Sequence, residues 1–297
     1  MIIDAHVHVG PLDQYGLMVD DFIKSLSHWP TWWDPSRNWR REDIARPTEE
    51  LIKDMDKYGI DKSCLLPFVA IPRKCKVSLD WVAGEVKKYP DRLIGFVSVD
   101  PIGGLKAVRE LDYGIDKLGF KGLKLSTAYN LVSLDDKRTW PVWERAEELG
   151  IPVLVHTAKA TSRCPIAWQD PLLLTEVGDA FPELKLIMCH AGAVWGEHAF
   201  AMADHFPNFY VEVSFLPTLG MDYIIHIAQL IKAMGIDAGS LFEKAIYGTD
   251  YPWASNNHVN LWKKVPMMMK ERGMDPCATD DDIKKLIGGN MAKLLKI

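Results

Sequence analysis

The strongest constraint on the fold of this chain is a repeated order of short apolar segments and longer helical ones. Eight runs rich in β-branched and other apolar residues recur along the 297 residues, at 2–7, 60–66, 93–99, 119–125, 151–156, 184–189, 209–213 and 245–248. Segments with helical periodicity lie between them, among others at 48–58, 77–89, 135–149, 171–181 and 221–234. Because strands buried on both faces are apolar throughout, this order indicates parallel βα units. Eight such units predict an α/β fold of the (β/α)8, or TIM-barrel, type rather than an open, doubly wound sheet.

Two segments depart from the alternation. Residues 10–47 separate the first run from the first clear helix, and we expect an insertion or lid there, because a loop of this length is commonly functional. Its tryptophans could form an aromatic wall for a planar substrate, a small core of their own or a subunit contact; they are Trp29, Trp32, Trp33 and Trp39. Apolar residues at helical spacing between 283 and 295 predict a docked C-terminal helix. With no linker in between, residues 1–297 are expected to form a single TIM-barrel domain.

Composition limits the partners and the location. The 35 basic and 40 acidic residues give a net charge of −5, which offers no support for binding to nucleic acid or to a membrane surface. The five cysteines form no CxxC pair and are odd in number, as expected of reduced cytoplasmic thiols. No apolar stretch approaches the roughly 18 residues of a membrane span, and no signal peptide is evident. We therefore expect a soluble, cytoplasmic protein that acts on a small molecule.

Side chains able to bind metal follow four of the eight runs. His6 and His8 end the first, His156 ends the fifth, His190 follows the sixth and Asp250 follows the eighth. The carboxyl ends of barrel strands meet at one face, where barrel enzymes build their active sites. Residues two apart on a strand share a face, so His6 and His8 can hold one ion together. A pair of solvated histidines is the alternative for these two residues alone, but the four strand ends together predict a metal site.

The sequence around these residues resembles a known family. His6-Val7-His8, Val155-His156-Thr157, Cys189-His190-Ala191-Gly192 and Gly248-Thr249-Asp250-Tyr251-Pro252 are similar to motifs of the amidohydrolase superfamily. The similarity is greatest to its amidohydrolase-related branch, which contains aminocarboxymuconate-semialdehyde decarboxylase. The resemblance implies one divalent metal, commonly zinc, with His6, His8, His156 and Asp250 as its ligands. It also implies that His190 acts on the substrate or on metal-bound water, and that the protein is a homodimer.

Lys124, at the end of the fourth run, has two interpretations. In binuclear members of the superfamily a carboxylated lysine there bridges two metals, and His156 and His190 would then hold the second ion. The alternative is an unmodified lysine that binds a substrate carboxylate or pairs with an acid.

Other residues are candidates for substrate binding or support. Trp253 follows Asp250 and Tyr129 follows the fourth strand, so both are expected at the mouth of the barrel. Arg163 or Arg40 could clamp a substrate carboxylate, although a surface role is the alternative for each. Glu212 and Ser214, at the end of the seventh run, are candidates for supporting contacts.

The leading functional hypothesis is a metal-dependent hydrolase, which uses a metal-activated water on a small carbonyl-containing or carboxylic acid substrate. Asp250 would accept the proton and His190 would stabilise the oxyanion. The close alternative is a nonoxidative decarboxylase, or carboxy-lyase, of an unsaturated or aromatic acid, in which His190 handles the proton that replaces carbon dioxide. A non-catalytic metal-binding barrel is the alternative of another class. The motifs themselves do not separate hydrolysis from decarboxylation.

Overall fold

Nine parallel segments surround a central axis in the computed structural model, which describes residues 1–26, 40–160, 164–234, 240–254 and 256–297. They are β1 (Ile3–Val7), β2 (Lys62–Leu65), β5 (Leu93–Gly95), β6 (Val97–Ser98), β7 (Leu123–Leu125), β8 (Pro152–His156), β9 (Lys185–Cys189), β10 (Phe209–Glu212) and β11 (Ala245–Ile246). Neighbours along the chain pair in parallel, except that β5 and β6 are the two pieces of the third predicted run, separated at Phe96. Each of the eight predicted runs therefore contains a strand.

The first and last strands close the ring. The backbone N–H of Ala5 donates to the carbonyl of Tyr247 at 3.0 Å, and that of His8 donates to the carbonyl of Tyr251 at 2.7 Å. With this closure the eight βα units form the predicted (β/α)8 barrel.

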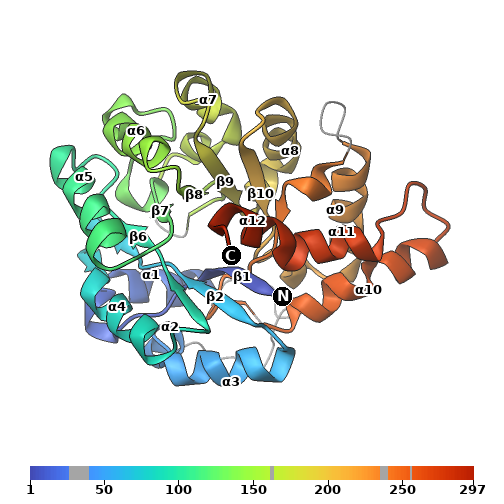
Figure 1. Cartoon of the computed structure of the whole chain (residues 1–297), viewed down its shortest axis with the longest axis horizontal. Helices are drawn as coiled ribbons and strands as arrows, with labels where there is room; N and C mark the ends of the chain where they lie inside the picture. Colours follow the sequence, from blue (N-terminus) through green and yellow to red (C-terminus); the bar gives the residue numbers. More distant parts are fainter. Residues whose placement is uncertain (27–39, 161–163, 235–239, 255) are drawn as a thin grey trace.

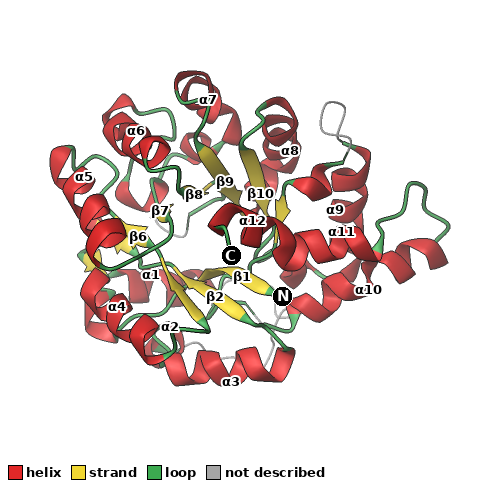
Figure 2. Cartoon of the chain, viewed as in Figure 1, coloured by secondary structure: helices red, strands yellow, loops and turns green. Residues whose placement is uncertain are grey.

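Helices form a ring around the strands (Figures 1 and 2). They are α3 (Thr48–Tyr58), α4 (Leu79–Lys88), α5 (Leu105–Asp112), α6 (Trp140–Glu148), α7 (Thr175–Ala180), α8 (Gly196–His205), α9 (Met221–Ala233) and α10 (His258–Glu271). α3 has the predicted bounds, whereas others are shorter. α4 begins at Leu79 because the Ser78 hydroxyl accepts the N–H of Trp81 and caps the first turn.

Side chains from several strands fill the interior of the barrel, and the C-terminal segment covers one end. The buried interior cluster contains Ile3, Ala5, Cys64, Leu66, Phe96, Leu154, Ile187, Cys189 and Ile246, with Met291, Leu294 and Leu295 from α12 (Asn290–Leu295). The predicted terminal helix is thus present, but in two parts, since α11 (Asp280–Lys284) precedes a π-helical segment that leads into α12. A β-carbon on Gly288 would collide with the backbone of Met1, so only glycine allows this approach. α12 lies over the centre of the barrel beside the N-terminus (Figure 1).

The insertion after β1 contains helical structure of its own. It includes α1 (Met18–Leu26) and the short α2 (Arg41–Ile44), and its residues Trp29, Trp32, Trp33 and Trp39 lie outside the described residues. α1 buries Met18, Val19 and Phe22 against the core. A small antiparallel hairpin of β3 (Val69–Ala70) and β4 (Cys75–Lys76) follows β2. Among the described helices, none combines the length and the apolar content needed to cross a membrane.

Candidate active site

A register shift in β1 aims two histidines at the mouth of the barrel. Asp4 is paired with Ser63 of β2 and Val7 with Leu65, so three steps along β1 oppose two steps along β2. Such a bulge turns the side chains that follow it. Ile3 and Ala5 accordingly pack in the barrel interior, while His6 and His8 line a cavity at the carboxyl ends of the strands.

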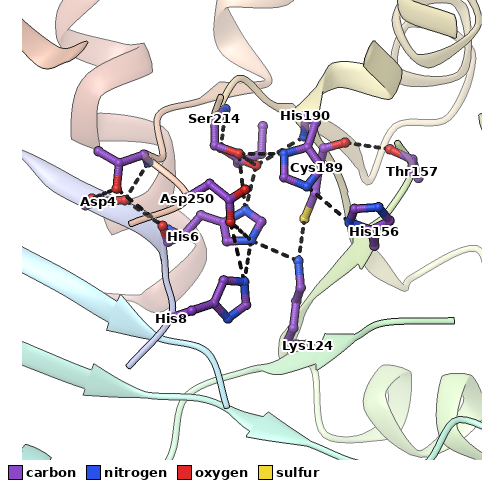
Figure 3. Close-up of polar contacts among 12 residues, drawn as sticks. Asp4, His6, His8, Lys124, His156, Thr157, Cys189, His190, Ser214 and Asp250 are labelled. Atoms are coloured by element: carbon purple, nitrogen blue, oxygen red, sulfur yellow. Dashed lines mark hydrogen bonds and ion pairs between the residues drawn. The ribbon is translucent and has the colours of Figure 1, made fainter. Parts of the chain in front are cut away.

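Three predicted ligands converge at this point (Figure 3). His6 Nε2 lies 3.1 Å from His8 Nε2, and Asp250 Oδ1 lies 3.4 Å from the first nitrogen and 3.5 Å from the second. All three side chains are buried. Two ligands bound at about 2.1 Å to one ion, at an angle of about 90 to 110°, are about 3.0 to 3.4 Å apart. The spacing of these three atoms is therefore compatible with a shared metal ion.

The hydrogen-bond partners of Nδ1 in His6 and His8 determine which ring nitrogen carries the proton. His6 Nδ1 is 3.0 Å from the Glu212 carboxylate, and His8 Nδ1 is 2.7 Å from the carbonyl oxygen of Leu66. The carbonyl oxygen can only accept, and so can the Glu212 carboxylate in its ionised form, so each ring then carries its proton on Nδ1 and presents an unprotonated Nε2. The lone pairs of His6 Nε2 and His8 Nε2 then face each other at 3.1 Å, which is favourable when both bind one cation. In histidine metal sites the other ring nitrogen is commonly held by a hydrogen bond in the same way.

The loop after β11 holds Asp250 firmly. Asp250 has a φ of 67°, a conformation that a non-glycine residue adopts only when its surroundings enforce it. Its N–H donates to the carbonyl of His6 at 2.8 Å. The neighbouring Thr249 donates to the buried carboxylate of Asp4 from its N–H at 2.9 Å and from its hydroxyl at 2.6 Å. The carboxylate of Asp250 is thereby fixed beside His6 and His8.

His156 and His190 form the adjoining side of the site (Figure 3). His190 Nε2 lies 3.1 Å from His156 Nδ1. His156 Nε2 is buried and has no hydrogen-bond partner among the described residues. A buried nitrogen without a partner is costly, so this atom fits the place of a further ligand. Both rings line the same cavity as His6 and His8.

Burial sets the charge states of the site. It lowers the pKa of His6, His8 and His190 well below the usual value and that of His156 to about 3, so the imidazoles are neutral, as metal ligands must be. Burial raises the pKa of Asp250 to about 8, although the charge of Lys124 opposes this. An ionised carboxylate in this place is unfavourable unless a cation lies beside it.

Lys124, on β7, is fully buried at the base of the cavity. Its Nζ lies 3.1 Å from His6 Nε2 and 3.2 Å from the sulfur of Cys189 (Figure 3). The expected position beside the site is therefore observed.

The cavity above these residues has a volume of about 350 Å³ and mainly apolar walls. Trp253 and Tyr129 line it, as expected, together with Phe22 and Phe68. The ring of Trp253 stacks on that of Phe22, with centroids 4.5 Å apart, and Phe68 meets Tyr129 edge to face at 5.0 Å. The cavity thus offers aromatic surfaces to a flat ligand of small size.

The two arginines predicted to bind substrate are not among the described residues that line the cavity, and two phenylalanines that were not predicted line it. Arg40 does not line the cavity: its side chain is exposed and pairs with Asp43 at the start of α2. Arg163 lies outside the described residues. Phe22 and Phe68 were not identified from the sequence. Phe22 could have been found, since Met18, Val19 and Phe22 have the spacing of one helix face within the insertion.

Comparison with known proteins agrees with this architecture. The amidohydrolase family model matches residues 3–297. A 2-amino-3-carboxymuconate-6-semialdehyde decarboxylase of Dictyostelium discoideum is 24% identical over 73% of this chain, but the match spans only 64% of that protein, less than two thirds of its length. A gamma-resorcylate decarboxylase of Polaromonas sp. strain JS666 is 23% identical over 89% of this chain and 92% of its own.

Solved structures share the fold. The dihydroxybenzoic acid decarboxylase of Polaromonas sp. JS666, determined with manganese and the inhibitor 2-nitroresorcinol, superposes with a TM-score of 0.72 at 19% identity. The superposition covers 99% of this chain and 96% of the other. Since the family model covers nearly the whole sequence and the barrel carries the expected residues at its mouth, this chain is an enzyme that belongs to the amidohydrolase family.

Proposed function

We propose that this protein is a divalent-metal-dependent, nonoxidative decarboxylase of a small aromatic or unsaturated acid. The observation that carries the proposal is an aromatic-walled cavity whose base holds His6, His8 and Asp250. Lys124 and Lys159 also line this cavity and make it suitable for an acid. The names of both curated relatives support decarboxylation, and they support the hydrolase hypothesis less well.

We assign the metal to His6, His8, His156 and Asp250. The unprotonated Nε2 atoms of His6 and His8, the unpartnered Nε2 of His156 and the buried carboxylate of Asp250 support this assignment. A nitrogen and oxygen donor set accepts either zinc or manganese. A divalent ion bound there would supply a Lewis acid that holds the oxygens of the substrate and stabilises negative charge.

The residues of the chain perform the rest of the proposed reaction. Trp253 and Phe22 offer aromatic faces against which a planar substrate can pack, as the walls of small-ligand sites commonly do. The bond between the carboxyl group and its carbon breaks, carbon dioxide leaves, and a proton takes its place on that carbon. Water supplies this proton, and we assign its relay to the carbon to His190, which lines the cavity beside the predicted ligands, with the carboxylate of Asp250 nearby.

Carbon dioxide release from a panel of acids tests the proposal. The panel contains 2,6-dihydroxybenzoate, 5-carboxyvanillate and an unsaturated semialdehyde acid, beside esters, lactones and amides of similar size. We expect carbon dioxide from one class of acid and no hydrolysis, with the activity lost in Asp250→Asn. Binding of 2-nitroresorcinol, followed by calorimetry, is a second readout that needs no turnover. Hydrolysis of an ester, lactone or amide without carbon dioxide release would contradict the decarboxylase proposal and favour the hydrolase hypothesis.

A further inference from the structure

The carboxylate of Glu212 accepts hydrogen bonds on both oxygens at the end of β10. Its Oε1 accepts the backbone N–H of Ser214 at 2.5 Å, and its Oε2 accepts the backbone N–H of His190 at 3.3 Å. A backbone N–H can only donate, so both carboxylate oxygens are held as acceptors. Glu212 is fully buried, and backbone groups of the chain donate to its oxygens.

Glu212 fixes the proton of His6 directly. Its Oε2 lies 3.0 Å from His6 Nδ1, and with the carboxylate ionised this contact requires a hydrogen on the nitrogen. The other ring nitrogen of His6 is then unprotonated, and it faces His8 and Asp250.

Ser214 extends this constraint to His190. The Ser214 hydroxyl donates to Glu212 Oε2 at 2.8 Å, and the same oxygen lies 2.9 Å from His190 Nδ1. A hydroxyl has one hydrogen, and here Glu212 receives it. His190 must therefore donate from Nδ1 to the serine oxygen, which leaves its Nε2 without a proton.

His190 in turn constrains His156. The unprotonated His190 Nε2 lies 3.1 Å from His156 Nδ1, so the hydrogen between them belongs to His156. The proton of His156 is thus on Nδ1, and its Nε2 carries a lone pair. This Nε2 is the buried atom that has no partner among the described residues.

We infer that Glu212 is a positioning residue that sets the tautomers of three histidines, His6 directly and His190 and His156 through Ser214. One carboxylate thereby presents His6 Nε2 and His156 Nε2 as lone pairs and keeps His190 Nε2 as a proton acceptor. The inference rests on the proposed function only in calling two of these atoms metal ligands. The hydrogen-bond chain itself follows from the contacts.

Gly248 lies against the carboxylate of Glu212 and the side chain of His6. A β-carbon on Gly248, after β11, would collide with Glu212 Oε1 and lie 2.7 Å from the β-carbon of His6. Glycine at position 248 therefore allows the Glu212 carboxylate to lie against His6.

Ser214→Ala tests the chain of hydrogen bonds without removing the carboxylate. The ring tautomers of His6, His156 and His190 can be read from long-range ¹H–¹⁵N correlations in zinc-loaded and in metal-free protein. In the parent we expect all three rings to carry the proton on Nδ1. In metal-free Ser214→Ala we expect His190 and His156 to lose this uniform state, while His6 keeps it through Glu212. In the zinc-loaded protein a bond from His156 Nε2 to the ion would itself hold the proton of His156 on Nδ1. Unchanged tautomers of His190 and His156 in the metal-free variant would overturn the inference.

Metal affinity, measured by competition with a chelator, is the second readout. Supporting contacts of this kind are commonly worth about 10- to 100-fold in affinity. We expect Glu212→Gln to weaken binding by that amount, Ser214→Ala to weaken it less, and Ser214→Thr, which keeps the hydroxyl, to stay near the parent. Ser98→Ala is the matched control, because the buried Ser98 hydroxyl donates to the backbone carbonyl of Lys124 and has no hydrogen bond to a histidine among the described residues.

The two proposals fail in different ways. A parent protein that binds zinc but releases no carbon dioxide contradicts the proposed function and leaves the tautomer assignment standing. A protein that decarboxylates normally, but whose His190 and His156 rings do not respond to Ser214→Ala in the metal-free state, contradicts the inference alone.

Discussion

Phe22 stacks on Trp253, with ring centroids 4.5 Å apart and ring planes inclined by 29°. Phe22 comes from α1 in the insertion after the first strand, and Trp253 comes three residues after Asp250 in the loop that follows the last strand. The insertion and the final loop thus build one wall of the cavity together. The loop that carries a predicted metal ligand also carries a predicted substrate contact.

We predict that Trp253→Leu raises the KM for the acid substrate by about tenfold, which corresponds to about 1.4 kcal/mol of binding energy. The substitution removes an aromatic face but no metal donor, so metal content stays unchanged. Steady-state kinetics and metal analysis of the same preparation check both statements. Trp262→Leu, a buried tryptophan in α10 outside the cavity lining, is the control and is expected to lower stability without raising KM.

We predict one divalent ion per chain in protein purified without added metal. Asp250→Asn removes the charged donor from the site, and we expect at least a 100-fold loss of metal affinity, together with loss of activity. Mass spectrometry of the metal and chelator competition provide the measurement. Protein that holds no metal and takes up none on reconstitution would refute the proposed ligand set.

Lys124→Met separates the two interpretations of the buried lysine. If Lys124 is unmodified, the variant keeps one ion and binds it more tightly, because a basic group 3.1 Å from His6 Nε2 no longer opposes the cation. We expect this outcome, together with a loss of activity on acids. A parent with two ions per chain and a variant with one or none would instead establish a carboxylated, bridging lysine.

Gly248→Ala and Gly84→Ala are expected to have opposite effects on stability. At position 248 the added methyl group meets Glu212 and His6, so we expect a loss of about 1 to 3 kcal/mol and weaker metal binding. At position 84, exposed within α4, it meets no atom within 4 Å and improves helix propensity by about 0.5 to 1 kcal/mol. Urea unfolding at fixed metal content compares the two variants. Equal effects of the two substitutions would contradict the tight packing around Glu212.

We expect His258, the first residue of α10, to contribute to the loss of the free energy of unfolding at acidic pH. Burial lowers the pKa of His258 from 6.5 to about 4, so the unfolded chain binds this proton more readily than the folded protein does. The free energy of unfolding therefore falls as the pH drops from about 6.5 to 4, by roughly 3 kcal/mol for this residue.

His258→Gln should flatten the dependence in that window, measured by chemical unfolding at several pH values with the same metal content in parent and variant. His226→Gln, at an exposed position on α9, is the control. An unchanged slope in His258→Gln would show that the ring does not remain neutral in the folded protein.

The sequence predicted the barrel and the meeting of His6, His8 and Asp250 because both depend on local signals. Apolar runs mark buried strands, and side chains at the carboxyl ends of barrel strands converge at one face. The bulge in β1 could not be predicted, since it depends on the register against β2. The contact between Phe22 and Trp253 also depends on tertiary packing between residues far apart in the sequence. The identity of the metal, the homodimer and the cytoplasmic location stay predictions.

The order of strands also determines when the site can come into existence. The backbone of β1 hydrogen-bonds to the segment around Tyr247 and Tyr251, more than 240 positions later in the chain. A growing polypeptide that has been made only as far as β10 carries its site histidines but lacks Asp250, and one edge of its first strand is still open. Open strand edges invite pairing with other chains. During synthesis, ring closure can therefore occur only after the segment around Tyr247 and Tyr251 has been made. Closure pairs the open edge of β1, and the complete donor set for the ion exists only once Asp250 is present.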